Sequence, residues 1–97
     1  QSMKWAIVFY AIFGYVDGSG TEQDISYGLT FNHHETCISF FEDNKKKVID
    51  GVKTYAEMNY EYPMQLLEVG CAHATIKPNN EPPEVTMEMP LWNGNKV

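Results

Sequence analysis

The order of apolar and polar residues along the chain predicts two strands near its beginning. Residues 5–13 are apolar throughout and rich in aromatic and branched side chains, a pattern typical of a strand buried on both faces. Residues 25–31 alternate between apolar and polar positions, which is the period of a strand with one buried face. Residues 17–20 include two glycines and predict a reversal between the strands. We therefore expect a hairpin with a loop over residues 15–24.

The stretch that follows has the spacing of a helix. Asn32 is a candidate N-cap, and Pro63 ends the helical pattern. Between them, apolar residues recur at three- and four-residue intervals and share one helical face: Cys37, Ile38, Phe41, Val48, Ile49, Val52, Tyr55 and Ala56. We expect one long helix over residues 34–59. A kink or short break near residues 42–45 is the alternative, because Asn44 is a weak helix former.

A third strand and a tail complete the pattern. Residues 64–74 are mostly apolar and predict the third strand, whereas residues 77–84 are polar, rich in proline and typical of a linker. Residues 85–92 alternate once between apolar and polar positions. They form either a tail or an edge strand, because Pro90 lacks the N–H that a central strand donates.

These elements predict an α+β domain of the ββαβ type. A right-handed crossover from the second strand to the third carries the chain past the first strand, which gives the sheet order 2-1-3. We expect an antiparallel/mixed three-stranded sheet with one long helix on one face. This single domain occupies residues 3–76, and residues 77–97 are a Pro-rich linker and C-terminal tail or edge strand. Gln1 and Ser2 resemble the remainder of an expression tag.

The charge balance excludes several kinds of partner. The 97 residues include 13 acidic residues against 7 basic ones, all lysine, which gives a formal net charge of −6. Nucleic-acid phosphates and anionic membranes repel such a chain, and it lacks the arginine guanidinium that commonly binds phosphate. Its longest apolar run is also shorter than the roughly 20 residues of a membrane span. We therefore expect binding to neither nucleic acid nor membrane.

The predicted topology brings the two cysteines to the same end of the sheet. Cys37 lies in the first turn of the helix and Cys71 lies late in the third strand, each on an apolar face. We expect their sulfurs to be adjacent, as two buried free thiols or as a disulfide. With His33 and His73 they would also supply the two sulfurs and two nitrogens of a structural zinc site. The spacing is unlike that of common zinc fingers, so we expect no metal and no cofactor.

One helix can cover only one face of a three-stranded sheet. The other face would carry four large apolar side chains and one acid, which are Val8, Tyr10, Ile12, Leu66 and Glu68. Left open, this face would expose roughly several hundred Å², more than a monomer usually tolerates. We expect a second copy to cover it, in a homo-oligomer of which a twofold-symmetric dimer is the simplest. The alternative covering is the tail, folded back over the same face.

Motifs for catalysis do not occur in the sequence. It contains no Gly-x-Ser-x-Gly, no phosphate-binding glycine loop and no His-Glu-x-x-His. Glu68 lies within an apolar strand and is either a candidate general base or an acid that faces solvent or an oligomer interface. We expect no catalytic residue.

Two stretches carry a resemblance to a known group of proteins. The apolar strand MKWAIVFYAIFG is followed, over residues 29–72, by a Phe-containing strand, a helix that opens with Cys, and a strand that closes with EVGCA. This arrangement resembles small proteins of unknown function from tailed marine bacteriophages, over residues 3–72. The resemblance implies no catalytic residue. It implies a place in the cytoplasm of an infected bacterium, where thiols stay reduced.

Two classes of function follow from these observations. The first is a small non-catalytic interaction or regulatory module that binds a host protein or a ligand, which the acidic charge, small size and Pro-rich tail favour. The alternative is a small oligomeric enzyme, or a sequesterer of a nucleotide-like metabolite such as S-adenosylmethionine, with its pocket at the subunit interface.

Overall fold

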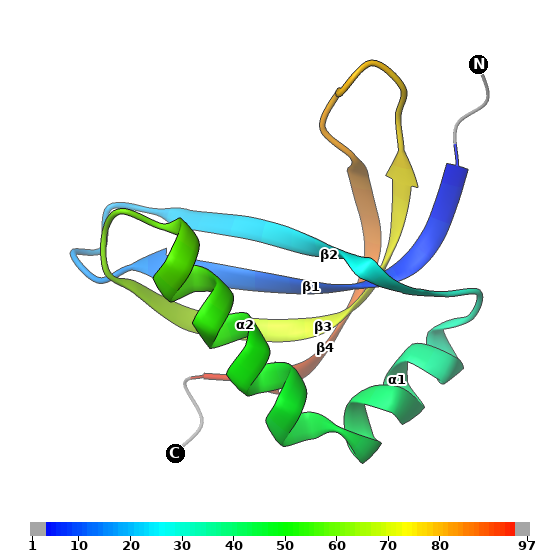
Figure 1. Cartoon of the computed structure of the whole chain (residues 1–97), viewed down its shortest axis with the longest axis horizontal. Helices are drawn as coiled ribbons and strands as arrows, with labels where there is room; N and C mark the ends of the chain where they lie inside the picture. The colour runs from blue at the N-terminus through cyan, green and yellow to red at the C-terminus, as the bar shows by residue number, and fades with distance from the viewer. Residues whose placement is uncertain (1–3, 95–97) are drawn as a thin grey trace.

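The computed structural model describes residues 4–94, which form one sheet and two helices (Figure 1). Along the chain the elements are β1 (Lys4–Tyr15), β2 (Thr21–Phe31), α1 (His34–Asp43), α2 (Lys45–Asn59), β3 (Met64–Ile76) and β4 (Glu84–Asn93). Gln1 and Ser2, interpreted as a tag remainder, lie outside the described residues. Of the two helices in this range, neither has the length and apolar character needed to cross a membrane.

The sheet has four antiparallel strands in the order β2-β1-β3-β4. The prediction of a three-stranded sheet with one long helix is therefore wrong, although the first three strands do lie in the order 2-1-3. β1 is a central strand because its residues are apolar on both faces, and it pairs along its length with β2 and β3. The fourth strand is β4, formed by residues for which a tail and an edge strand were the two alternatives, and the edge strand is the one observed.

β4 lies at the edge of the sheet, where a proline can be accommodated. Pro90 pairs with Gly70 at a point where the register between β3 and β4 shifts, so its missing N–H interrupts no regular ladder. The backbones approach closely there, because a Cβ on Gly70 would lie 2.2 Å from the carbonyl oxygen of Met89. The expected linker and tail of residues 77–97 thus include a strand of the domain itself.

A break at Asn44 divides the predicted long helix into α1 and α2. Asn44 has φ −131° and ψ 27°, outside the helical range, and its side-chain Nδ2 donates a hydrogen bond to the carbonyl oxygen of Phe40 at 3.0 Å. The side chain therefore satisfies a carbonyl at the end of α1 and competes with continuation of the helix. Because the chain turns at this point, α1 and α2 run in different directions (Figure 1).

The main core lies between the helices and the sheet. Its centre is aromatic, because the Phe9 ring lies within 5.6 to 6.3 Å, centroid to centroid, of Phe31, Phe40 and Phe41. Ile49 and Ala56 of α2 join the same buried cluster. This cluster anchors both helices to β1 by contacts that are purely apolar.

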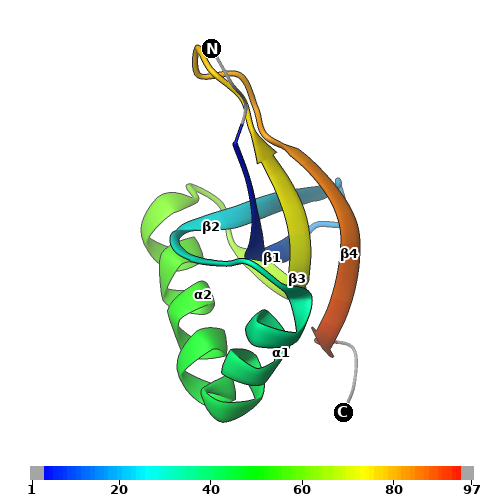
Figure 2. The same ribbon diagram turned by 90° about the vertical axis from the view of Figure 1, so that its right-hand side faces the viewer.

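The sheet curves strongly (Figure 2). Its two edge strands, β2 and β4, are linked by a hydrogen bond between side chains. Gln23 of β2 donates a hydrogen bond from Nε2 to a carboxylate oxygen of Glu88 of β4 at 3.1 Å. On the face of β1 turned away from the helices, Val8 and Tyr10 are only 0% and 1% exposed. The chain's own strands thus bury two members of the predicted dimer face, and no partner is needed to cover them.

Leu66 does not lie on that face. The register between β1 and β3 shifts, so that Ile12 pairs with Glu68 and Phe13 pairs with Leu66, and Leu67 is the extra residue. One extra residue reverses which side chains face the helices. Leu66 consequently belongs to the core under the helices, and its grouping with Val8 was wrong. Ile12 and Glu68 are half-buried.

Candidate functional site

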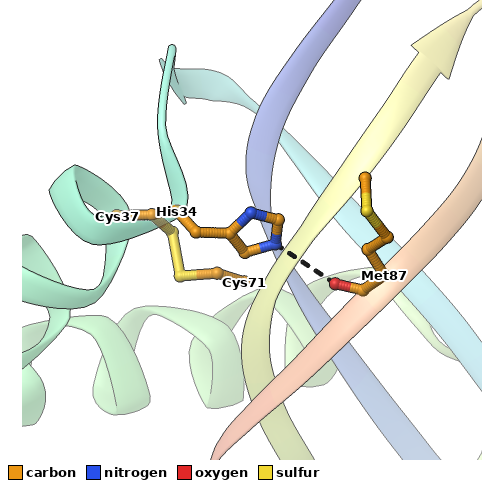
Figure 3. Close-up of a disulfide and its surroundings, with 4 residues drawn as sticks. All are labelled: His34, Cys37, Cys71 and Met87. Carbon is orange, nitrogen blue, oxygen red and sulfur yellow. Dashed lines mark hydrogen bonds between the residues drawn. A yellow bond between two sulfur atoms is a disulfide. The ribbon is translucent and has the colours of Figure 1, made fainter.

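The two cysteines expected to be adjacent are bonded in the structure. The Cys37 and Cys71 sulfurs form a disulfide of 2.07 Å with Cα atoms 6.3 Å apart, and both residues are fully buried (Figure 3). Beside it, the His34 Nε2 atom lies 3.2 Å from the carbonyl oxygen of Met87. These two links tie α1 to β3 and β4. The bonded pair also differs from the reduced thiols that the cytoplasm would maintain.

The disulfide leaves no thiolate for a zinc ion at this place. His33 is exposed, and His73 stacks on Trp5 with ring centroids 5.1 Å apart. Across residues 4–94, no group of three or more His, Cys, Asp or Glu side chains is arranged to hold a metal ion. Because cysteine binds zinc as the thiolate, the geometry does not favour the zinc alternative.

Glu68 has a buried partner. The Tyr10 hydroxyl donates a hydrogen bond to a carboxylate oxygen of Glu68 at 2.5 Å. Burial, and then this hydrogen bond, raises the pKa of Tyr10 far above its ordinary value, so the hydroxyl stays a neutral donor. The pair therefore satisfies a buried polar group, which is a structural role for Glu68.

A bulge in β2 opens the sheet beside β1. Tyr10 pairs with Ile25 and Val8 pairs with Thr30, so the single residue between Val8 and Tyr10 faces residues 26–29 of β2. The surplus residues of β2, 26–29, leave the regular ladder and are exposed. The backbone of β2 is thus lifted away from β1 at this point.

A cavity of about 690 Å³ lies at this bulge, and its walls come from α2, from β1 and β2, and from Pro82, Pro83 and Val85 around the start of β4. We call it the α2–β2 cavity. Its walls are mainly aromatic and aliphatic and include Phe9, Phe13, Leu29, Phe40, Val48 and Val52. In the sheet, α2 contacts chiefly β3, whereas α1 contacts β1, β2 and β3.

One face of α2 supplies a wall of this cavity. Lys47, Val48, Gly51, Val52 and Tyr55 all line it, at the spacing of successive helical turns. Gly51 stands in the middle of this stripe, and a Cβ built there would meet no atom within 4 Å. A glycine in a helix interior costs about 1 kcal/mol relative to alanine. The glycine therefore weakens α2 and leaves open space along this wall of the cavity.

The opposite wall is held to α2 by a polar contact. The Tyr60 hydroxyl, at the C-terminal end of α2, donates a hydrogen bond to a carboxylate oxygen of Asp24 in β2. Burial, and then this hydrogen bond, raises the pKa of Tyr60 far above its ordinary value. At the mouth, Tyr27 and Tyr55 remain 62% and 48% exposed, so aromatic surface is available to a ligand.

Sequence reasoning did not find this cavity. Val48 and Val52 were assigned only to the apolar face of the expected long helix. A glycine on the apolar face of a helix could have indicated the cavity, because glycine there contributes no side-chain packing and lowers helix stability. The bulge in β2 could not be predicted, since residues 25–31 alternate as in a regular strand.

Comparisons of the chain with family models, with curated proteins and with solved structures gave no match. The resemblance to bacteriophage proteins therefore stays a prediction. The case for a function rests on the geometry of the α2–β2 cavity.

Proposed function

We propose that this chain is a small non-catalytic binding module that holds an apolar or aromatic small molecule in the α2–β2 cavity. The observation that carries the proposal is the cavity itself, about 690 Å³ in volume and lined largely by aromatic and aliphatic side chains. Small-molecule sites are typically cavities of about 300–1,000 Å³ with mainly apolar walls and a few polar groups. The α2–β2 cavity has these properties.

The walls of the cavity are held by contacts that do not depend on a ligand. The Tyr60–Asp24 hydrogen bond joins the far end of α2 to β2, and the Cys37–Cys71 disulfide fixes α1, which precedes α2. A site whose walls are already in place loses little conformational entropy when a ligand binds. Because its walls are preorganised, the cavity fits a small-molecule binding site better than a packing defect.

Substitutions at Gly51 test the proposal without disturbing the core. Because a Cβ at this position meets no atom within 4 Å, Gly51→Leu adds a side chain into the cavity without a backbone clash. Gly51→Ala is the matched control, since it adds only a methyl group and gives the same kind of gain in helix stability. Both variants should fold, and only the leucine variant should lose binding.

The experiment is a thermal-shift screen of the wild type, G51A and G51L. The compounds are uncharged and anionic aromatic molecules, together with nucleotides and S-adenosylmethionine, which represent the alternative function. A saturable rise in melting temperature with an aromatic compound, present in G51A and lost in G51L, supports the proposal. A rise of equal size in all three proteins, or no rise with any compound, contradicts binding in the α2–β2 cavity.

A further inference from the structure

The four lysines of α2 differ in their partners. Lys46 forms an ion pair with Asp50 at 2.9 Å. Lys45 and Lys53 lie over aromatic rings, those of Phe41 and Trp92, each 5.9 Å from the ring centroid. Lys47, which lines the α2–β2 cavity, has no hydrogen bond, ion pair or ring partner among residues 4–94.

The acidic group of the cavity is already engaged. Asp24 accepts the hydrogen bond from Tyr60 described above, and Gln23 donates to Glu88. The ammonium of Lys47 is therefore the charged group at the cavity with donors still available. A cation beside an apolar hollow is complementary to a ligand whose apolar body fills the hollow and whose anionic group lies at the rim.

The charge of the whole chain limits how much negative charge such a ligand can carry. The formal net charge is −6, so the field of the protein opposes the approach of polyanions such as nucleoside triphosphates. One lysine can offset one negative charge at short range. The combination favours a ligand with a single anionic group over one with several.

We infer that the α2–β2 cavity selects a monoanionic amphiphile, with an apolar or aromatic body in the cavity and a carboxylate or sulfonate bound by Lys47. This inference rests on the proposed function and adds to it the chemical class of the ligand. The ammonium supplies a charge-assisted hydrogen bond, and the aromatic walls supply the apolar contact area.

Two fluorescent probes with a shared aromatic body separate these contributions. Anilinonaphthalene sulfonate carries one negative charge, and phenylnaphthylamine is its uncharged counterpart. Each is titrated into the folded wild type, K47Q and K46Q. K46Q is the matched control, because Lys46 is the neighbouring residue, 88% exposed, and does not line the cavity. Urea unfolding of each variant checks that all three proteins are folded.

We expect the sulfonate to bind the wild type more tightly than the uncharged probe. K47Q should weaken sulfonate binding by about tenfold, the size of a lost charge-assisted hydrogen bond, while changing the uncharged probe by less than about twofold. K46Q should leave both probes nearly unchanged.

The failure of this inference differs from the failure of the proposed function. Equal weakening by K47Q and K46Q, or binding of both probes with the same affinity, overturns the role of Lys47 while the cavity remains a binding site. If G51L binds both probes as tightly as the wild type, the dyes bind elsewhere, and both conclusions are overturned.

Discussion

Reduction of the Cys37–Cys71 disulfide should strongly destabilise this domain. The bond joins residues separated by 34 positions and lies where α1 packs on β3. Closing a loop of this length removes roughly 12–13 cal/mol/K of entropy from the unfolded chain, which corresponds to about 4 kcal/mol at 25 °C. Small domains are stable by only about 5–15 kcal/mol, so this link is a large share of the total.

The assay is urea unfolding of the wild type with and without a reductant. With an unfolding slope of about 1–2 kcal/mol per M, a loss of about 4 kcal/mol lowers the urea midpoint by roughly 2–4 M. The double variant Cys37→Ala, Cys71→Ala is the control, because its midpoint should not respond to the reductant. Alkylation under native and unfolding conditions counts the free thiols before reduction.

Two results would refute this reasoning. Two reactive thiols in unfolded but unreduced protein would show that the bond is not present in solution. An unchanged midpoint on reduction would show that the link between α1 and β3 contributes little beyond the packing of the core.

Two further predictions concern single positions, and a third concerns the oligomeric state. Gly70→Ala should destabilise the fold by about 1–3 kcal/mol, because its Cβ would lie 2.2 Å from the Met89 carbonyl oxygen, whereas Gly28→Ala, with no neighbour within 4 Å, should change the urea midpoint little. The raised pKa of Tyr10 means that the stability contributed by its neutral hydroxyl is fully present below a pH of about 10 and is lost as the pH rises further. Tyr10→Phe should therefore show a smaller fall in stability above that pH, and an identical fall in both proteins would contradict the assignment. A dimer stays a prediction and would have to use surfaces other than Val8 and Tyr10; light scattering supports it at twice the chain mass of 11.1 kDa and contradicts it at that mass.

The sequence contained enough information for the central strands and for the cysteine pair. β1 was predictable because residues 5–13 are apolar on both faces, which only a central strand tolerates. The juxtaposition of Cys37 and Cys71 followed from the expected topology, in which β2 and β3 run in the same direction, so that the start of α1 and the end of β3 lie at the same end of the sheet. Both inferences depended on patterns that extend over many residues.

The errors arose where a single residue decides the geometry. The apolar helical spacing continues on both sides of Asn44 and favoured one long helix, whereas the structure has the alternative, a short break near residues 42–45, where the Asn44 side chain ends α1. Leu67 is one extra residue in β3, and it moves Leu66 to the opposite face. Pro90 restricted β4 to an edge but did not prevent it from forming, because the register shifts at that point. The periodicity of apolar residues encodes neither a bulge nor a side chain that ends a helix.

Amide proton–nitrogen correlation spectra of the labelled protein, recorded during titration with phenylnaphthylamine, test most directly whether the α2–β2 cavity is a binding site. We predict saturable shifts concentrated at the residues that line the cavity, above all Leu29, Gly51 and Val52, with little change at Ser19 in the turn between β1 and β2, which does not line it. Shifts centred on residues outside this lining, or no saturable shifts at all, would contradict the proposal that the chain binds a small apolar molecule in this cavity.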